Sequence, residues 1–305
     1  MRKLVVAGLA LWLGIALSSA ALASPVLTMV EPGPEGLLDG YPDTYLVKLS
    51  APDYWQRDPA YGGFPNGGAA YCTPTSISNS IMWFDDHGWE DLVVDTADPK
   101  KDQFDLIEVL AGPDYCNTSP TGGSSVSDYV PGLQDYFDDS AYGTSPGFVV
   151  KYQGLAYTGD EWTGVYAPQE DWIKAELSRC EDVILRVGWY YETSPGVIER
   201  YGGHCVTFVG YDDTGQSYNP GDIIIHDPDD GTAAVTHDNY AVSTLWIDFG
   251  MGPQPFMLIE NYGGADFAIV DGAIAASPLP EPCSMLLLSL GLGGIGIYRR
   301  RKRAA

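Results

Sequence analysis

The sequence predicts an α+β fold, with helices first and strands last along the chain. Apolar residues recur at the three- and four-residue spacing of amphipathic helices in segments that end near residue 178. Short runs rich in Val, Ile, Tyr and Phe, which are typical of strands, follow from residue 183. Helical runs followed by strand runs indicate the α+β class. The body between the two terminal segments, roughly 255 residues, is long enough for one domain.

The same patterns predict the individual elements in order. We expect helices over 72–87, 101–111, 130–137 and 170–178, with one early strand over 148–157. Later strands are expected over 183–191, 204–211, 222–226, 233–236, 256–261 and 267–273. The segment 24–50 is rich in Pro and Gly and is expected to lie on the surface. The segment 53–70 contains two Gly pairs and is expected to be a loop that leads into the first helix.

The first predicted helix begins with a cysteine. Pro74 suits an early helical position, because the amide proton that it lacks would have no partner there, and Gly88 is a natural stop. At a helix N-terminus the pKa of a cysteine falls from ~8.5 into the range of about 3.5–7.5. Cys72 is therefore a candidate nucleophile. The alternative is a buried structural cysteine or half of a disulfide.

Two later segments supply partners for a nucleophilic cysteine. His204 opens a predicted strand directly after Gly202 and Gly203, and Asp227 follows the next strand. With Cys72, a base and an orienting carboxylate on neighbouring strands are the parts of a Cys–His–Asp triad. The alternative for His204 is a buried structural histidine. The other histidines lack the Gly-Gly approach, which leaves a side chain open to a substrate: His87, His226 and His237.

The motifs around these residues resemble those of papain-like cysteine peptidases of the bacteriocin-leader-processing type. The motifs are Cys72-Thr73-Pro74-Thr75-Ser76, the run from Gly203-His204 to Val209-Gly210-Tyr211-Asp212, and Asp227-Pro228 at a strand end. The resemblance covers roughly Ala51 to Asp230. It implies a papain-like cysteine proteinase fold over residues 51–277, with an N-terminal helical part and a C-terminal antiparallel sheet.

The resemblance also implies a role for each site residue. Cys72 would be the nucleophile, His204 the base and Asp227 the orienting group. The family usually has glycine after the cysteine, whereas this chain has Thr73. Family members also carry a glutamine shortly before the cysteine, whose amide helps to form the oxyanion hole. The only glutamine on that side of Cys72 is Gln56, across a Gly-rich loop, and we place it in that role.

Both ends of the chain read as targeting segments. Residues 1–23 have a basic start, an apolar run and an Ala-Leu-Ala cleavage pattern, which predict a secretory signal peptide. In residues 278–305, Pro280-Glu281-Pro282 precedes an apolar run of about fifteen residues, short of the ~20 that span a bilayer. Five basic residues follow, at the cytoplasmic side by the positive-inside rule.

This tail resembles the PEP-CTERM sorting signal of Gram-negative bacteria; the alternative is an ordinary tail anchor. The resemblance implies an exosortase as partner, which would cleave near Pro280-Glu281-Pro282. The protein would be held in the inner membrane by its short transmembrane segment before processing. It would then lie at the cell surface or outside the cell.

The charge of the chain limits its partners. With 41 acidic and 16 basic residues the net charge is −25, which repels nucleic acid and anionic membrane surfaces. We expect no cofactor. The acidic turns 212–215 and 227–231 could offer calcium their carboxylate oxygens, but solvated hairpin turns rich in Asp and Gly are the preferred interpretation, so we expect no metal.

The positions of the remaining cysteines predict which face Cys205 occupies and which disulfides are possible. Side chains alternate along a strand, so Cys205 is expected on the face opposite His204, pointing away from the chemistry. An oxidising exterior allows one disulfide among Cys116, Cys180 and Cys205, and a pair between Cys180 and Cys205 would suit adjacent strands. Cys283 lies in the sorting segment.

Three functional hypotheses follow. The first is an exported cysteine hydrolase, a peptidase that attacks a peptide or protein substrate. The second is a catalytically inert surface or biofilm-matrix protein with the same fold, for which the extracellular polysaccharide matrix is a possible partner. The third retains the triad but transfers acyl groups to amines, as transglutaminases do.

Overall fold

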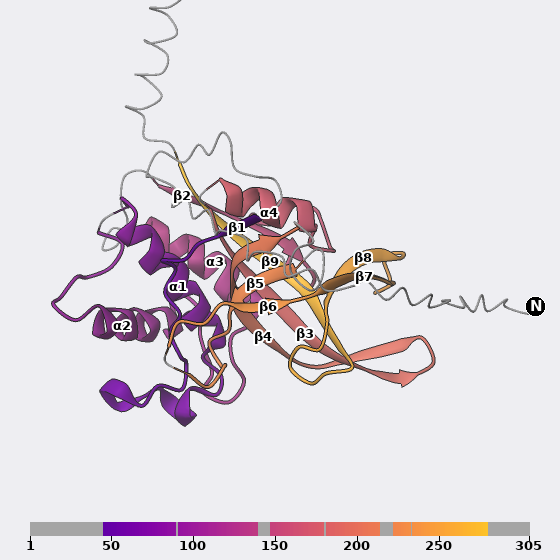
Figure 1. Ribbon diagram of the computed structural model, residues 1–305, viewed down its shortest axis with the longest axis horizontal. Coiled ribbons are helices and arrows are strands. Elements are labelled where there is room, and N and C mark those ends of the chain that lie inside the picture. The colour runs from indigo at the N-terminus through magenta and orange to yellow at the C-terminus, as the bar shows by residue number, and fades with distance from the viewer. Residues whose placement is uncertain are drawn as a thin grey trace, which may run out of the picture.

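The computed structural model describes residues 45–89, 91–139, 147–179, 181–213, 222–232 and 234–279. A short strand, β1 (Tyr45–Val47), leads into three helices, which gather on one side of the molecule (Figure 1). These helices are α1 (Cys72–Asp86), α2 (Pro99–Ala111) and α3 (Val126–Asp138). The chain then runs through β2 (Phe148–Gly154), α4 (Glu170–Ser178), β3 (Asp182–Ser194), β4 (Val197–Asp212), β5 (Asp222–His226), β6 (Asp238–Tyr240), β7 (Val242–Ile247), β8 (Gln254–Ile259) and β9 (Phe267–Pro278).

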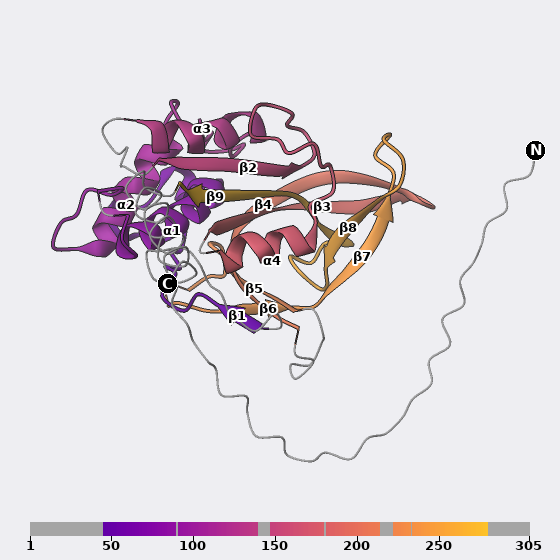
Figure 2. The ribbon, with the colours of Figure 1, turned by 90° about the horizontal axis from the view of Figure 1, so that it is seen from above.

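All described strands belong to one nine-stranded antiparallel sheet. Its order is β6-β5-β4-β3-β9-β8-β7, with β1 paired to β4 and β2 paired to β9. The sheet curves into a nearly closed, barrel-like form. Figure 2 shows α3 and α4 on opposite sides of β9. The long hairpin of β3 and β4 extends away from the helices in both views.

The predicted papain-like fold, an N-terminal helical part followed by a C-terminal antiparallel sheet, is wrong. The structure is mostly antiparallel sheet with few helices. Strands are also distributed along the whole chain: β1 precedes every α-helix, and β2 lies between α3 and α4. Both early strands pair with late ones, so the helices form no separate part. These pairings join residues far apart in sequence, which local periodicity does not reveal.

Several predicted boundaries also differ from the structure. Residues 45–50, expected to lie in a surface extension, include β1 and enter the sheet. No strand covers 234–236 in the described chain, and the strands β6 and β7 follow instead. The strand β4 begins at Val197 rather than at His204, because its first half forms the exposed hairpin arm. The remaining predicted helices and strands match structural elements within a few residues at most ends.

The sheet separates two hydrophobic clusters. One cluster lies between the helices and the sheet and includes Cys205 and Val209 of β4. The other lies on the opposite face beside α4 and includes Val206 and Phe208. The predicted alternation of buried side chains along β4 is therefore confirmed. This strand contributes to both clusters, so its position relative to α1 is firmly fixed.

Some predictions fall outside the described residues. These are the signal peptide, the extension before residue 45, the sorting segment from residue 280, and the cysteines Cys180 and Cys283. Within the described ranges, none of the helices has the length and apolar character needed to cross a membrane.

A buried ion pair joins the segment after β1 to the start of β3. Lys48 Nζ lies 2.6 Å from Asp182 Oδ1, donates to the carbonyl of Glu181 at 2.8 Å, and sits 3.8 Å from the centre of the Trp83 ring. Both charged side chains are only 2% exposed. Burial raises the pKa of Asp182, although Lys48 opposes this effect. Breaking a buried pair on one side leaves an uncompensated charge in the core.

We therefore expect Lys48→Met to lower the free energy of unfolding at neutral pH by about 3–5 kcal/mol. The loss should shrink as the pH falls, because the unpaired Asp182, with a pKa raised further in the folded state, can take up a proton and become neutral. Urea unfolding at pH 7.5 and at pH 5 measures both effects.

The matched control is Lys101→Met. Lys101 pairs with Asp105 on the surface of α2, and removing an exposed pair should cost less than ~1 kcal/mol. Equal losses in the two variants, or a Lys48→Met loss that does not depend on pH, would contradict the expected role of the buried pair.

Candidate active site

The structure places Cys72 at the first residue of α1. This helix is almost entirely buried, and its first turns lie against β4. Ser76 Oγ donates to the carbonyl of Cys205 at 2.9 Å, and Thr207 Oγ1 donates back to the carbonyl of Ser76 at 3.2 Å. Asn79 Nδ2 donates to Thr207 Oγ1 at 3.2 Å. These bonds hold the half-buried Cys72 beside the strand that carries His204.

His204 lies where β4 passes from solvent into the core. Residues 197–203 are exposed or half-buried, and every residue from 204 to 212 is buried. His204 itself is 7% exposed. Gly203, directly before it, is closely packed: an added Cβ would lie 3.0 Å from the carbonyl of Val187 and would require the Arg200 side chain, whose Nη2 would be 2.0 Å away, to move. The Gly-Gly approach noted in the sequence therefore reflects tight packing at this border.

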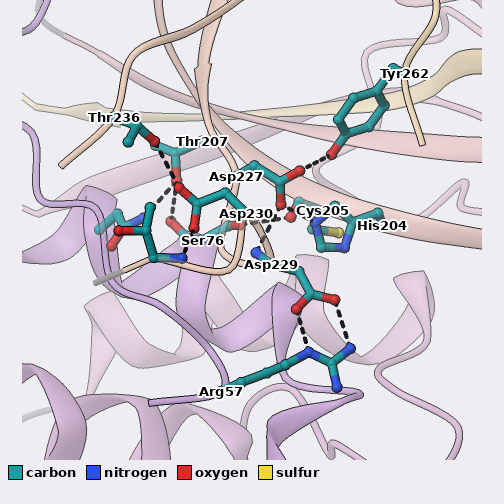
Figure 3. Close-up of polar contacts among 12 residues, drawn as sticks. Arg57, Ser76, His204, Cys205, Thr207, Asp227, Asp229, Asp230, Thr236 and Tyr262 are labelled. Atoms are coloured by element: carbon teal, nitrogen blue, oxygen red, sulfur yellow. Dashed lines mark hydrogen bonds and ion pairs between the residues drawn. The ribbon is translucent and has the colours of Figure 1, made fainter. Parts of the chain in front are cut away.

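Asp227 follows β5 and faces the imidazole of His204 (Figure 3). Its Oδ1 lies 2.6 Å from His204 Nε2 and accepts the backbone N–H of Asp229 at 2.8 Å. Its Oδ2 accepts the hydroxyl of Tyr262 at 2.6 Å. With three hydrogen-bond partners the carboxylate has little freedom to rotate. It therefore fixes the orientation of the imidazole.

The ring nitrogen that remains, Nδ1, is the one available to Cys72, whose sulfur hydrogen-bonds to His204. A hydrogen bond from Cys205 and the charge of His204 hold the pKa of Cys72 well below its usual range. Burial lowers the pKa of His204, but the Cys72 thiolate and Asp227 overcome this effect and raise it to about 10. Burial raises the pKa of Asp227, but His204 and Tyr262 outweigh burial and lower it. The site is arranged to hold a thiolate–imidazolium ion pair.

Two aromatic residues that sequence reasoning missed complete the surroundings of His204. The Trp189 ring stacks on the imidazole, with centroids 5.9 Å apart and planes 17° apart. Glycines flank the indole, since an added Cβ would lie 3.0 Å from it at Gly202 and 2.7 Å from it at Gly263. Tyr262 follows β8 and contacts Asp227. An isolated Trp or Tyr gives no local signal of such a role, which arises from strand pairing.

Gln56 reaches the same loop as Asp227. Its backbone N–H donates to the carbonyl of Pro228 at 2.8 Å. The neighbouring Arg57 pairs with Asp229, with Nη2 2.7 Å from Oδ2. The Gln56 side chain is buried, and its Oε1 has no hydrogen-bond partner within the part of the chain that the structure describes. The structure thus brings Gln56 to the Asp227 loop, beside the turn that carries the orienting carboxylate.

The alternation argument predicted that Cys205 points away from the catalytic residues, and this prediction is wrong. The Cys205 sulfur hydrogen-bonds to Cys72 and accepts the hydroxyl of Thr73 at 3.3 Å. The alternation itself is correct, but α1 covers the face that carries Cys205 and brings its own N-terminus there. Cys205 lies opposite Arg186 of β3, and the predicted pair with Cys180 involves a residue outside the described chain.

The other histidines lie apart from this group. His87 Nδ1 is 2.7 Å from the carbonyl of Trp83, in the last turn of α1. His226 Nδ1 is 3.0 Å from the carbonyl of Pro52, and its ring packs against His237. Within the described ranges no three His, Cys, Asp or Glu side chains are grouped as a metal site.

The ion pair predicts that Cys72 reacts with iodoacetamide at slightly acid pH, far faster than Cys116 or Cys205. An ordinary cysteine with a pKa of ~8.5 is only about 0.1% thiolate at pH 5.5, whereas the lowered pKa of Cys72 increases its thiolate fraction there. Burial raises the pKa of Cys116, and the bond to Cys72 raises that of Cys205. Peptide mapping after timed labelling measures each rate.

The same labelling in urea is the control, because unfolding gives every cysteine an ordinary pKa and should abolish the selectivity. Slow and equal labelling of all three thiols in the folded protein would mean that the ion pair is absent.

No protein-family model and no curated sequence matches this chain.

Proposed function

We propose that this protein is an exported cysteine hydrolase that acts on peptide or protein substrates. The observation that carries the proposal is the contact of His204 Nε2 with Asp227 Oδ1 at 2.6 Å, beside a cysteine at the start of a helix. A nucleophile, a base and an oriented carboxylate are the parts needed for acyl transfer through a thiol. The low pKa of Cys72 supports the role of nucleophile.

In the proposed reaction, the Cys72 thiolate attacks the carbonyl carbon of an amide and forms a tetrahedral intermediate. The His204 imidazolium then gives its proton to the leaving amine, which yields an acyl-enzyme. Neutral His204 takes a proton from water, the resulting hydroxide attacks the thioester, and the acid product and the thiolate are released. Asp227 keeps Nε2 engaged throughout, so that Nδ1 carries the proton that is exchanged.

The oxyanion of the intermediate needs donors close to Cys72. The first N–H groups of a helix have no partner within it, so the backbone N–H of Cys72 is the first candidate. Gln56 is the second, through its side-chain amide. Trp189 covers one face of His204. This packing reduces the access of water to the ion pair and strengthens the electrostatic interactions within it.

We further propose that export delivers this activity outside the cell. The signal pattern of residues 1–23 and the tail of residues 278–305 support a route through the inner membrane with an exosortase as partner. The body is strongly acidic, which suits an extracellular protein that does not bind nucleic acid.

Substitutions of the triad test the proposal. Cys72→Ala should abolish hydrolysis of a fluorogenic peptide library. Asp227→Asn should reduce kcat by about 10²–10⁴-fold, the usual range for acid–base catalysis, and should also move the basic limb of the pH profile to lower pH. The direction follows because Asp227 helps to hold the pKa of His204 near 10.

The matched control is Cys116→Ala, which removes a buried thiol that the structure places outside the triad. Undiminished turnover in Cys72→Ala would overturn the hydrolase. If added amines accumulate as acylated products in place of the free acid, the protein is instead an acyl transferase. Absence of any turnover, with fast labelling of Cys72, would favour an inert matrix protein.

The sorting proposal predicts that mature protein lacks the peptide from Ser284 onward. An exosortase that cleaves near Pro282 would remove the apolar run and the five basic residues together. Mass spectrometry of the exported form from its native host decides the question. A chain that still ends at Ala305 would mean an ordinary tail anchor, and the matched host without its exosortase should retain the tail.

A further inference from the structure

Cys205 exchanges no proton and forms no bond to substrate in the proposed hydrolysis, yet its hydrogen bond to Cys72 helps to lower the pKa of the nucleophile. The Thr73 hydroxyl donates to its sulfur at 3.3 Å, and Cys205 in turn hydrogen-bonds to the sulfur of Cys72. All described cysteines are free thiols. A second thiol is unnecessary for nucleophilic catalysis, because His204 alone supplies the proton that the reaction needs. The pair therefore calls for a separate explanation.

The backbone around this thiol pair is rigid. Ser76 Oγ holds the carbonyl of Cys205 at 2.9 Å, one turn after Cys72 in the same helix. The two sulfurs come from a helix and a strand that pack as one unit, so their contact does not depend on a mobile loop. A bond between them would join two side chains that already hydrogen-bond to each other and would not need a domain movement.

The two thiols differ in access and in charge. Cys72 is half-buried and its pKa is held well below the usual range, whereas Cys205 is 4% exposed. The hydrogen bond to Cys72 is the largest cause that raises the pKa of Cys205, while Thr73 and Arg186 act in the opposite direction. An oxidant therefore meets Cys72 first, because a thiolate reacts and a buried thiol does not. Once Cys72 has lost its negative charge, Thr73 and Arg186 favour ionisation of Cys205.

We propose that Cys72 and Cys205 form a reversible disulfide when a hydroperoxide oxidises Cys72, and that this bond switches the site off. The Cys72 thiolate attacks one peroxide oxygen and the O–O bond breaks. Cys72 becomes a sulfenic acid, and the leaving alkoxide or hydroxide takes a proton from the His204 imidazolium. Cys205 then attacks the Cys72 sulfur. The S–S bond forms, the S–O bond breaks, and the hydroxyl leaves with the Cys205 proton as water.

In the net reaction, one hydroperoxide is reduced to an alcohol or to water, and two thiols are oxidised to a disulfide. One further water molecule is released. A dithiol reductant reverses it. Without a resolving thiol, a sulfenic acid proceeds to sulfinic and sulfonic acids, which a dithiol cannot reduce. Cys205 thus protects the nucleophile. The inference shares the Cys72 thiolate with the proposed hydrolase, but it requires no substrate.

The test treats the purified full chain with hydrogen peroxide under native conditions, followed by iodoacetamide and peptide mapping. We expect loss of iodoacetamide labelling at Cys72, a cross-linked pair of the peptides that contain Cys72 and Cys205, and full recovery of labelling after dithiothreitol. In Cys205→Ala, peroxide should instead give sulfinic and sulfonic Cys72, with no recovery. Cys116→Ala is the matched control and should behave as the wild type.

The outcomes separate this inference from the hydrolase. If Cys72 labels rapidly but peroxide gives no cross-link to Cys205, or if Cys205→Ala recovers as the wild type does, the disulfide is overturned and the hydrolase stands. If the cross-link forms while peptides are never cleaved, the switch stands and the hydrolase falls. Should Cys205→Ala fold poorly, Cys205→Ser and the wild-type peptide map retain the test. Cross-linking of Cys72 to any other cysteine overturns the inference.

Discussion

The candidate site depends on the hydrogen bonds that join the first turns of α1 to β4. The bonds from Ser76 to the carbonyl of Cys205 and from Thr207 to the carbonyl of Ser76 set the helix on one face of the sheet. They are buried, and a buried donor or acceptor that loses its partner is costly. The helix therefore has one favourable position along the strand. That position sets Cys72 beside His204, and it also sets Cys72 beside Cys205.

The second constraint is the border between exposed and buried strand at His204. On the solvent side the end of the β3 and β4 hairpin is exposed, and on the core side every residue of β4 from His204 onward is buried. An imidazole at such a border can meet a substrate while its far nitrogen stays in contact with the partly buried carboxylate of Asp227. Trp189 and Tyr262 complete the enclosed side. Charges interact more strongly in such an environment than in water, which explains why Cys72 and His204 shift each other's pKa so far.

The sequence predicted which residues lie together around Cys72 better than it predicted the fold. Cys72 before Pro74, His204 after two glycines, and Asp227 before a proline are local signals, and the structure brings these residues together. Those signals say nothing about which strands pair. The short β1 and the isolated β2 join β4 and β9 through contacts between distant residues, so an α+β pattern was predicted for a chain that forms mostly one sheet. The position of Cys205 was missed for the same reason, because alternation identifies two faces but not the one that a helix covers.

The central position of β9 has a consequence for synthesis. This strand lies between β3 and β8 and also pairs with β2, yet it is the last element of the described chain. A polypeptide that emerges from the ribosome N-terminus first cannot complete its sheet until residue 278 has been made. Tyr262, which holds Asp227, also arrives only at this late stage. The nascent chain thus carries the Cys72 thiol early, before the rest of the site is assembled. Shortened translation products that end before β9 would lack the centre of the sheet.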